Sequence, residues 1–150
     1  MRKVLFGIAA FLAAGAVQST VLAAGVNKNE IANALETGGY IVQEVQPSML
    51  AVTVGEHVIF VGLAGTDADV SYITYLPDVE LGLGGHAFMS EFNSEVKFGR
   101  AYIDRDGDVA LQMDRNSSGG VTLDNITSDF DVFLLLISKF LSDYQSQDSV

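Results

Sequence analysis

The sequence predicts an α+β domain in which helices flank an antiparallel sheet of about five to six strands and a long C-terminal helix forms part of the core. Three observations support this prediction. Short segments rich in β-branched and aromatic residues alternate with glycine-containing turns over residues 40–76. A second pair of such segments brackets an acidic turn at residues 104–108. Apolar residues then recur with helical spacing from residue 122 almost to the end of the chain.

Residues 1–23 are predicted to be a signal peptide and are set aside from the fold. Arg2 and Lys3 form a positive start, residues 4–17 an apolar segment, and Val21-Leu22-Ala23 a small-residue cleavage site. The apolar segment is shorter than the roughly 20 residues that span a bilayer, although an uncleaved anchor is the alternative. We therefore expect residues 24–150 to form one domain, periplasmic or secreted, with no stable membrane insertion after cleavage.

The first half of the domain is expected to be a short helix followed by strands. Asn29 is the predicted N-cap, Ile31 and Leu35 are the predicted buried residues, and Gly38-Gly39 is the predicted end of this helix. Three to four antiparallel strands in meander order then follow, from residues 40–45, 50–54, 57–63 and 70–76.

The second half is expected to contain a helix, a hairpin and the long final helix. Residues 87–96 predict a short helix, and residues 98–104 and 109–114 predict the hairpin. The predicted apolar side of the hairpin consists of Phe98, Ala101 or Tyr102, Ile103, Val109, Leu111 and Met113. Thr122 is the predicted N-cap of the final helix, and its predicted inner face is Ile126, Phe130, Phe133, Ile137 and Phe140.

Composition excludes several classes of function. The chain has a formal net charge of −11, and its few Lys and Arg residues are scattered, so nucleic acid is a poor partner. It has no cysteine, which rules out thiol catalysis, disulfides and thiolate metal sites. No G-x-S-x-G motif or other activated nucleophile is recognisable, so we predict no enzyme activity. An envelope hydrolase with an unmarked pair of carboxylates is the remaining enzymatic alternative.

Two polar segments could be mistaken for ligand sites. The acidic turn at 104–108 resembles the start of an EF-hand loop, but glycine stands at position 4 instead of 6 and Arg115 replaces the required Glu at position 12. We therefore predict a tight hairpin turn there. Gly119-Gly120 lacks the lysine of a phosphate-binding loop and is predicted to reverse the chain before the final helix. No catalytic residue, cofactor or metal is predicted, and His57 and His86 alone would make a poor zinc site.

Arg100 is the charge within the strand that is otherwise apolar and aromatic. It could clamp the carboxylate of a ligand, or it could pair with Asp114 across the hairpin or with Asp124 at the helix start. A carboxylate within the same domain is the commoner partner of such an arginine.

From about residue 29 to 140 the chain resembles the YbjN-like family of bacterial proteins. The resemblance is carried by residues 35–40, which end in Gly39-Tyr40, by residues 89–102, and by Met113-Asp114 followed by Gly119-Gly120. Ser90 and Phe92 stand where Asn and Trp are common in the family, and the cysteines of many exported relatives are missing. The positions that the resemblance marks as a structural motif are Gly39, Tyr40, Asn93, Arg100, Tyr102, Asp114, Gly119 and Gly120.

The resemblance implies an α+β fold like that of type III secretion chaperones, often dimeric, and the role of a sensory transduction regulator without established enzyme activity. We therefore expect an exported, non-enzymatic module, chaperone-like or regulatory, that binds a protein partner or a second copy of itself. The alternative is a periplasmic sensor that binds a small molecule or a cation through the acidic turn and Arg100.

Overall fold

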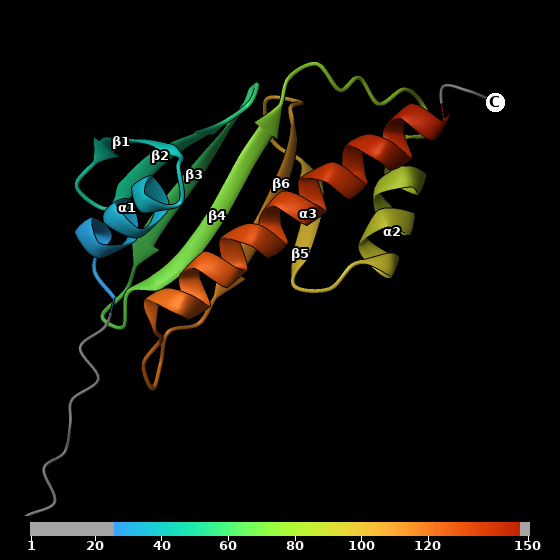
Figure 1. Ribbon diagram of the computed structural model, residues 1–150. Helices are drawn as coiled ribbons and strands as arrows, with labels where there is room; N and C mark the ends of the chain where they lie inside the picture. The colour runs from blue at the N-terminus through green and yellow to red at the C-terminus, as the bar shows by residue number, and fades with distance from the viewer. Residues whose placement is uncertain (1–25, 148–150) are drawn as a thin grey trace, which may run out of the picture.

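The computed structural model describes residues 26–147 as three helices and six strands (Figure 1). In chain order these elements are α1 (Lys28–Thr37), β1 (Ile41–Gln46), β2 (Met49–Val54), β3 (His57–Ala64), β4 (Asp69–Leu76), α2 (Gly85–Glu95), β5 (Gly99–Ile103), β6 (Val109–Arg115) and α3 (Leu123–Gln147). The predicted signal peptide, residues 1–23, lies outside the described residues. Within residues 26–147, no helix is both long enough and apolar enough to cross a bilayer.

All six strands form one sheet in the order β1-β2-β3-β4-β6-β5, and every neighbouring pair is antiparallel. The meander predicted for residues 40–76 is therefore confirmed as β1–β4. The predicted hairpin is confirmed as β5–β6, and it joins the meander through β6. This connection leaves β1 and β5 at the two edges. The α+β prediction is confirmed.

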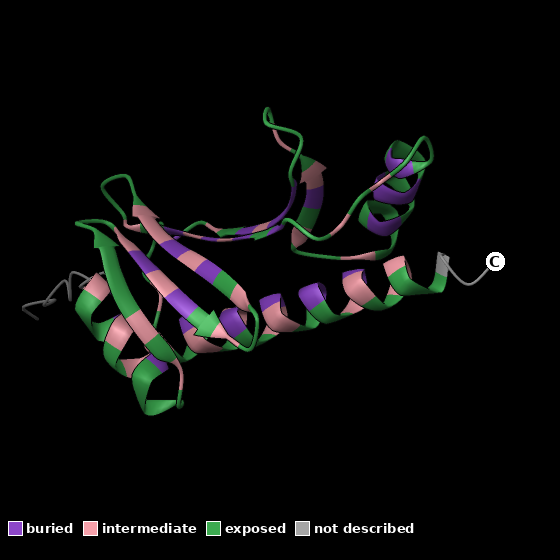
Figure 2. Ribbon diagram, turned by 90° about the horizontal axis from the view of Figure 1, so that it is seen from above, coloured by how far each residue is buried: buried purple, intermediate pink, exposed green. Residues whose placement is uncertain are grey.

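Helices α1 and α3 lie on one face of the sheet, and the hydrophobic core fills the space between them and the strands (Figure 2). In β2, β3 and β4 alternate residues are buried in this core, as the two-residue period of a strand requires. One row across the sheet shows the pattern, because its members lie opposite one another and are all buried: Val52, Ile59, Thr74, Leu111 and Ala101.

Helix α3 buries the face that its sequence predicts, namely Ile126, Phe130, Phe133, Ile137 and Phe140. Its start is also confirmed. The Thr122 hydroxyl accepts the Asn125 N–H at 3.2 Å, and the Asn125 side chain accepts the Thr122 N–H at 3.2 Å. These two bonds satisfy backbone donors that the first turn of a helix leaves free.

The predicted N-cap of the first helix was wrong. Asn27 caps α1 in place of Asn29, because its side chain accepts the Glu30 N–H at 3.1 Å while the Glu30 carboxylate accepts the Asn27 N–H at 3.0 Å. The reciprocal bonds require an acidic or amide side chain three residues after the cap, and Glu30 provides it for Asn27.

The predicted apolar side of the hairpin was partly wrong. Val109, Leu111 and Met113 are buried as expected, and Ala101 rather than Tyr102 faces the core with them. Phe98 is instead 77% exposed, and Ile103 is 37% exposed. Phe98 precedes β5 and has a left-handed backbone, with φ at +70°, so the strand alternation does not extend to it.

Candidate functional site

The sheet face opposite α1 and α3 is the first candidate region, and we call it the open sheet face. None of the three described helices covers it (Figure 2). A cross-strand row at its centre runs Gln43, Ala51, Phe60, Ile73, Gln112 and Arg100. Ile41, Val58 and Tyr75 lie on the same face and are 63%, 40% and 41% exposed. Exposed apolar side chains that gather on one face of a sheet are typical of an interaction site.

One end of the open sheet face carries a hydrogen-bonded network around Asp114. Ser71 Oγ donates to Asp114 Oδ1 at 2.7 Å, and Gln112 Nε2 donates to the same oxygen at 2.8 Å. Arg100 Nη1 lies 3.2 Å from Asp114 Oδ2. Tyr102 joins the network by donating its hydroxyl to Gln112 Oε1 at 3.2 Å.

The network sets the charge state of Asp114. Partial burial by itself would raise the pKa of this carboxyl group, but the hydrogen bonds from Gln112 and Ser71 and the charge of Arg100 outweigh it and lower the pKa. Of the alternatives for Arg100, the pairing with Asp114 is therefore the one found. The partner of Arg100 is thus a carboxylate within the same domain, as the commoner of the two readings expects.

Asn93 is the motif residue that closes the β5 edge of the sheet. Its Nδ2 donates to the Ala101 carbonyl oxygen at 2.9 Å, and the Ala101 N–H donates to its Oδ1 at 2.8 Å. The side-chain amide thus bonds both outward-facing backbone groups of Ala101, as a neighbouring strand would. It also ties α2 to β5.

The other motif residues lie at two different joints of the fold. Gly39 lies between α1 and β1 and has φ at +93°. The centroid of the Tyr40 ring lies 5.0 Å from that of the Phe130 ring on α3. Gly119 and Gly120 have φ at +87° and +95° between β6 and α3, where reversal of the chain was predicted. The structure thus brings Arg100, Tyr102 and Asp114 together, while the four residues at these joints shape the backbone.

The acidic turn is a hairpin turn, as the sequence predicts. Asp104 Oδ1 accepts the N–H groups of Asp106 and Asp108, both at 2.9 Å, and Gly107 has φ at +94°. Across the part of the chain that the structure describes, no group of three or more His, Cys, Asp or Glu residues could hold a metal ion.

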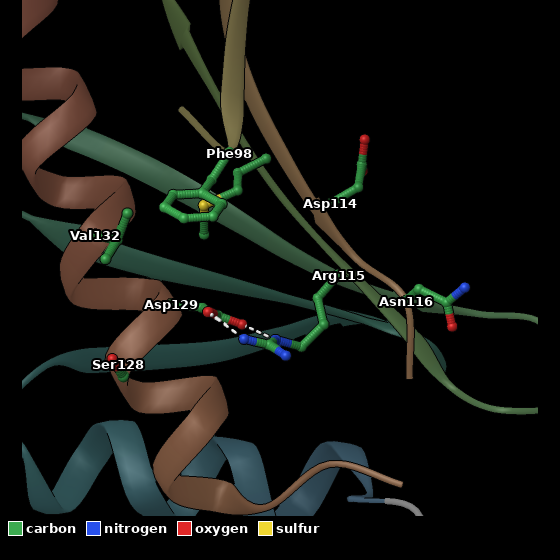
Figure 3. A pocket seen from close by; sticks show the side chains of 8 residues that line it. Phe98, Asp114, Arg115, Asn116, Ser128, Asp129 and Val132 are labelled. Atoms are coloured by element: carbon green, nitrogen blue, oxygen red, sulfur yellow. Dashed lines mark hydrogen bonds and ion pairs between the residues drawn. The ribbon is translucent and has the colours of Figure 1, made fainter. Parts of the chain in front are cut away.

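A cleft between the β5–β6 hairpin and the first half of α3 is the second candidate region, and we call it the Phe98 cleft. It encloses about 490 Å³, within the range of ligand pockets. Figure 3 shows the Phe98 ring near Val132 at its upper end and the Arg115–Asp129 pair below them. Its lining residues are Phe98, Met113, Asp114, Arg115, Asn116, Ser128, Asp129 and Val132.

Arg115 and Asp129 form a two-point ion pair in the wall of the Phe98 cleft. Arg115 Nε and Nη2 both donate to the Asp129 carboxylate, the second at 2.7 Å, and this bonding raises the pKa of Arg115. The pair also affects buried Tyr72. Burial is the largest cause of the raised pKa of the Tyr72 hydroxyl, and the negative charge of Asp129 raises this pKa further. The ion pair places one positive and one negative charge side by side in the cleft wall, so the two charges balance.

Phe98 stands at the cleft on a strained backbone. A left-handed conformation costs a bulky residue about 1–3 kcal/mol. The next residue is Gly99, where a Cβ would lie 2.5 Å from Leu136 Cδ1 on α3, so the close approach of β5 to α3 favours glycine at this position. That approach does not explain an aromatic side chain at position 98.

Sequence reasoning missed all three principal residues of this cleft. The predicted hairpin places Phe98 on its buried side, and Arg115 enters the sequence analysis only as a mismatch to a calcium-binding loop. Asp129 is not among the predicted site residues. The available signal was the position of Asp129, which lies next to Phe130 and four residues before Phe133 on the apolar stripe of α3. A charge at such a position needs a partner on the neighbouring element.

Comparison with known proteins places the chain in a family. A sequence profile described as "putative bacterial sensory transduction regulator", YbjN, matches residues 58–145, more than half of the chain. No curated protein matches the sequence of this chain. The crystal structure of YbjN from E. coli, described as "a putative transcription regulator", is similar in fold, with a TM-score of 0.64 and 14% identity over 82% of this chain and 94% of that chain. The resemblance found in the sequence is thus confirmed, and the chain belongs to the YbjN family.

Proposed function

We propose that this protein is an exported, non-enzymatic regulatory module that binds protein through the open sheet face, and that a second copy of the chain is its first partner. The family's description as a regulator supports a regulatory role. The observation that carries the proposal is the open sheet face itself. It combines exposed apolar side chains with almost no unpaired charge.

The charge distribution favours association at this face. The chain has a formal net charge of −11, so two copies repel each other over most approaches. On the open sheet face, Arg100 and Asp114 pair with each other, and Asp69 at its margin accepts the Ser117 N–H. The face itself carries little net charge. Two copies that meet at this face therefore keep the acidic remainder of their surfaces apart, and few charged groups lose their water in the contact.

The size of the open sheet face is sufficient for a dimer. Six strands about 4.8 Å apart, each about six residues long at roughly 3.3 Å per residue, span an area of about 25 by 20 Å. Two such faces together bury on the order of 1,000 Å², which is the lower limit for a specific interface. Sheets that pack face to face in this way interdigitate their side chains. Phe60 and Tyr75, whose rings make an edge-to-face contact with centroids 6.4 Å apart, are large side chains on this face that can do so.

Substitution of a charged residue at the centre of the open sheet face tests the proposal of self-association. We expect the wild-type protein to sediment as a dimer at micromolar concentration, and Phe60→Lys to sediment as a monomer with unchanged circular dichroism. Leu135→Lys is the matched control, because Leu135 is 70% exposed on α3 and lies away from the sheet face. A wild-type protein that stays monomeric at high concentration, or a control that dissociates equally, contradicts the proposal.

Export is a separate part of the proposal and rests on residues 1–23. We expect the protein recovered from the cell envelope to begin at Ala24, after removal of the signal peptide. N-terminal sequencing of that protein decides the matter. A chain that retains Arg2 and Lys3, or that is found only in the cytoplasm, contradicts export.

A further inference from the structure

Phe98 is a side chain that the fold does not explain. The residue is 77% exposed, so burial contributes little to stabilising it there, and its left-handed backbone would suit glycine better. The neighbouring Gly99 lies close to Leu136 on α3, which favours glycine at position 99 but gives no reason for an aromatic ring at position 98. A strained, exposed aromatic residue points to a contact outside the folded chain.

The surroundings of the ring define the kind of contact. The Phe98 cleft offers an apolar wall from Met113 and Val132 next to the ring, and the Arg115–Asp129 pair lies beyond it (Figure 3). Arg115 uses Nε and Nη2 for Asp129, which leaves Nη1 to donate to an acceptor on a ligand. The cleft is therefore amphipathic, with one aromatic platform and one hydrogen-bond donor.

We propose that the Phe98 cleft binds a small, flat, uncharged molecule that combines an aromatic ring with a hydrogen-bond acceptor such as a carbonyl oxygen. The ring of the ligand packs against Phe98 and Val132, and its acceptor receives the N–H of Arg115. An anion is disfavoured because Asp129 already balances the charge of Arg115 and the whole chain is acidic. A cation would compete with Arg115 for Asp129, and a cleft of about 490 Å³ suits a molecule of this size.

The cleft is distinct from the open sheet face, so this inference does not depend on self-association. Successive residues of β6 point to opposite sides of the sheet. Met113 and Arg115 line the Phe98 cleft. Asp114 also borders it, but its carboxylate takes part in the network on the open sheet face. The two regions can therefore be changed separately by substitution.

A solvent-sensitive dye tests the proposal on the purified protein. Prodan, a naphthalene that carries a ketone and no charge, has the proposed chemistry. We expect saturable binding to one site with a blue shift of the emission. Phe98→Gly should weaken this binding about tenfold or more, and it should raise the midpoint of urea denaturation because it relieves the backbone.

Two further variants distinguish dye bound in the Phe98 cleft from dye bound elsewhere on the surface. Val132→Trp fills the cleft without changing Phe98, and it should also abolish the blue shift. Tyr75→Ala removes an exposed aromatic residue from the open sheet face, and it should leave the dye affinity unchanged. The proposal is overturned if no saturable binding occurs, or if Phe98→Gly and Val132→Trp bind as the wild type does. A lowered denaturation midpoint in Phe98→Gly also overturns it, because the ring would then serve the fold.

Discussion

Asn93 takes the place of a neighbouring strand at the β5 edge, and it does so with one side chain. Its amide both donates to and accepts from the backbone of Ala101, at 2.9 and 2.8 Å. An uncovered edge strand is a template for unwanted pairing, so bonding at its centre also guards against aggregation. Sequence similarity to the family marked this residue as structural, and the geometry supplies the reason.

Replacement of Asn93 by Asp should destabilise the fold by about 1–3 kcal/mol, because a carboxylate oxygen would then face the Ala101 carbonyl oxygen without a donor between them. Urea denaturation followed by circular dichroism measures the change. Asn33→Asp, on the exposed side of α1, is the control and should change the free energy of unfolding by less than about 0.5 kcal/mol. An equal effect of the two substitutions would contradict the role assigned to Asn93.

Asp114 gives the protein a pH dependence whose sign follows from its lowered pKa. The unfolded chain binds a proton at this carboxyl group near pH 4, while the folded chain binds it only at lower pH. The stabilisation from the network is therefore present above about pH 4 and is lost as pH falls through the folded pKa. We expect Asp114→Asn to be less stable than the wild type by a constant amount from pH 7 to 5, and by less below about pH 4. Urea denaturation across this range would refute the assignment if the difference stayed the same at pH 3.

Helix α3 is the element whose sequence pattern and packing agree most fully. Its apolar residues recur over several turns, and the residues that the period selects are the ones buried against the sheet. Leu135 is an apolar residue on the solvent-facing side of this helix, and it is 70% exposed. The two sides of α3 can therefore be compared within one element.

Phe133→Ala should lower the free energy of unfolding by about 3–5 kcal/mol, because Phe133 is fully buried and its ring lies 6.0 Å from the ring of Tyr72. Leu135→Ala should lower it by less than about 1 kcal/mol. Chemical denaturation of both variants tests the orientation of the helix. Comparable losses would mean that α3 buries both sides, for instance in an assembly.

Element boundaries followed from the sequence wherever the backbone is regular. The strands β2, β3 and β4 begin and end within one residue of their predicted limits, because turns that contain glycine or proline bound them. The prediction failed at Phe98, since alternation presumes an extended backbone and Phe98 has a left-handed backbone just before β5. The alternation of apolar residues carries no information about this conformation.

At the scale of the whole molecule, the acidic charge is the dominant property. With a formal net charge of −11, the folded chain repels itself, and salt screens this repulsion. Raising NaCl from about 10 to about 150 mM should therefore raise the melting temperature. CaCl₂ at equal ionic strength should give a similar rise, because the Asp104 carboxylate is engaged in its own turn. A further rise at submillimolar calcium, followed by differential scanning fluorimetry, would instead reveal a specific cation site.

The sequence by itself determined the α+β class, the order of the helices and strands, the buried side of α3 and the family, because these depend on periodicity, turn residues and local motifs. Only the tertiary structure decided that Arg100 pairs with Asp114, that Asn93 closes the β5 edge, and that no helix within residues 26–147 covers one of the two sheet faces. It alone brought Phe98, Arg115 and Asp129 around one cleft. The physical reason is that these arrangements depend on how distant elements pack, and the energy of such contacts has no signature in any short stretch of residues.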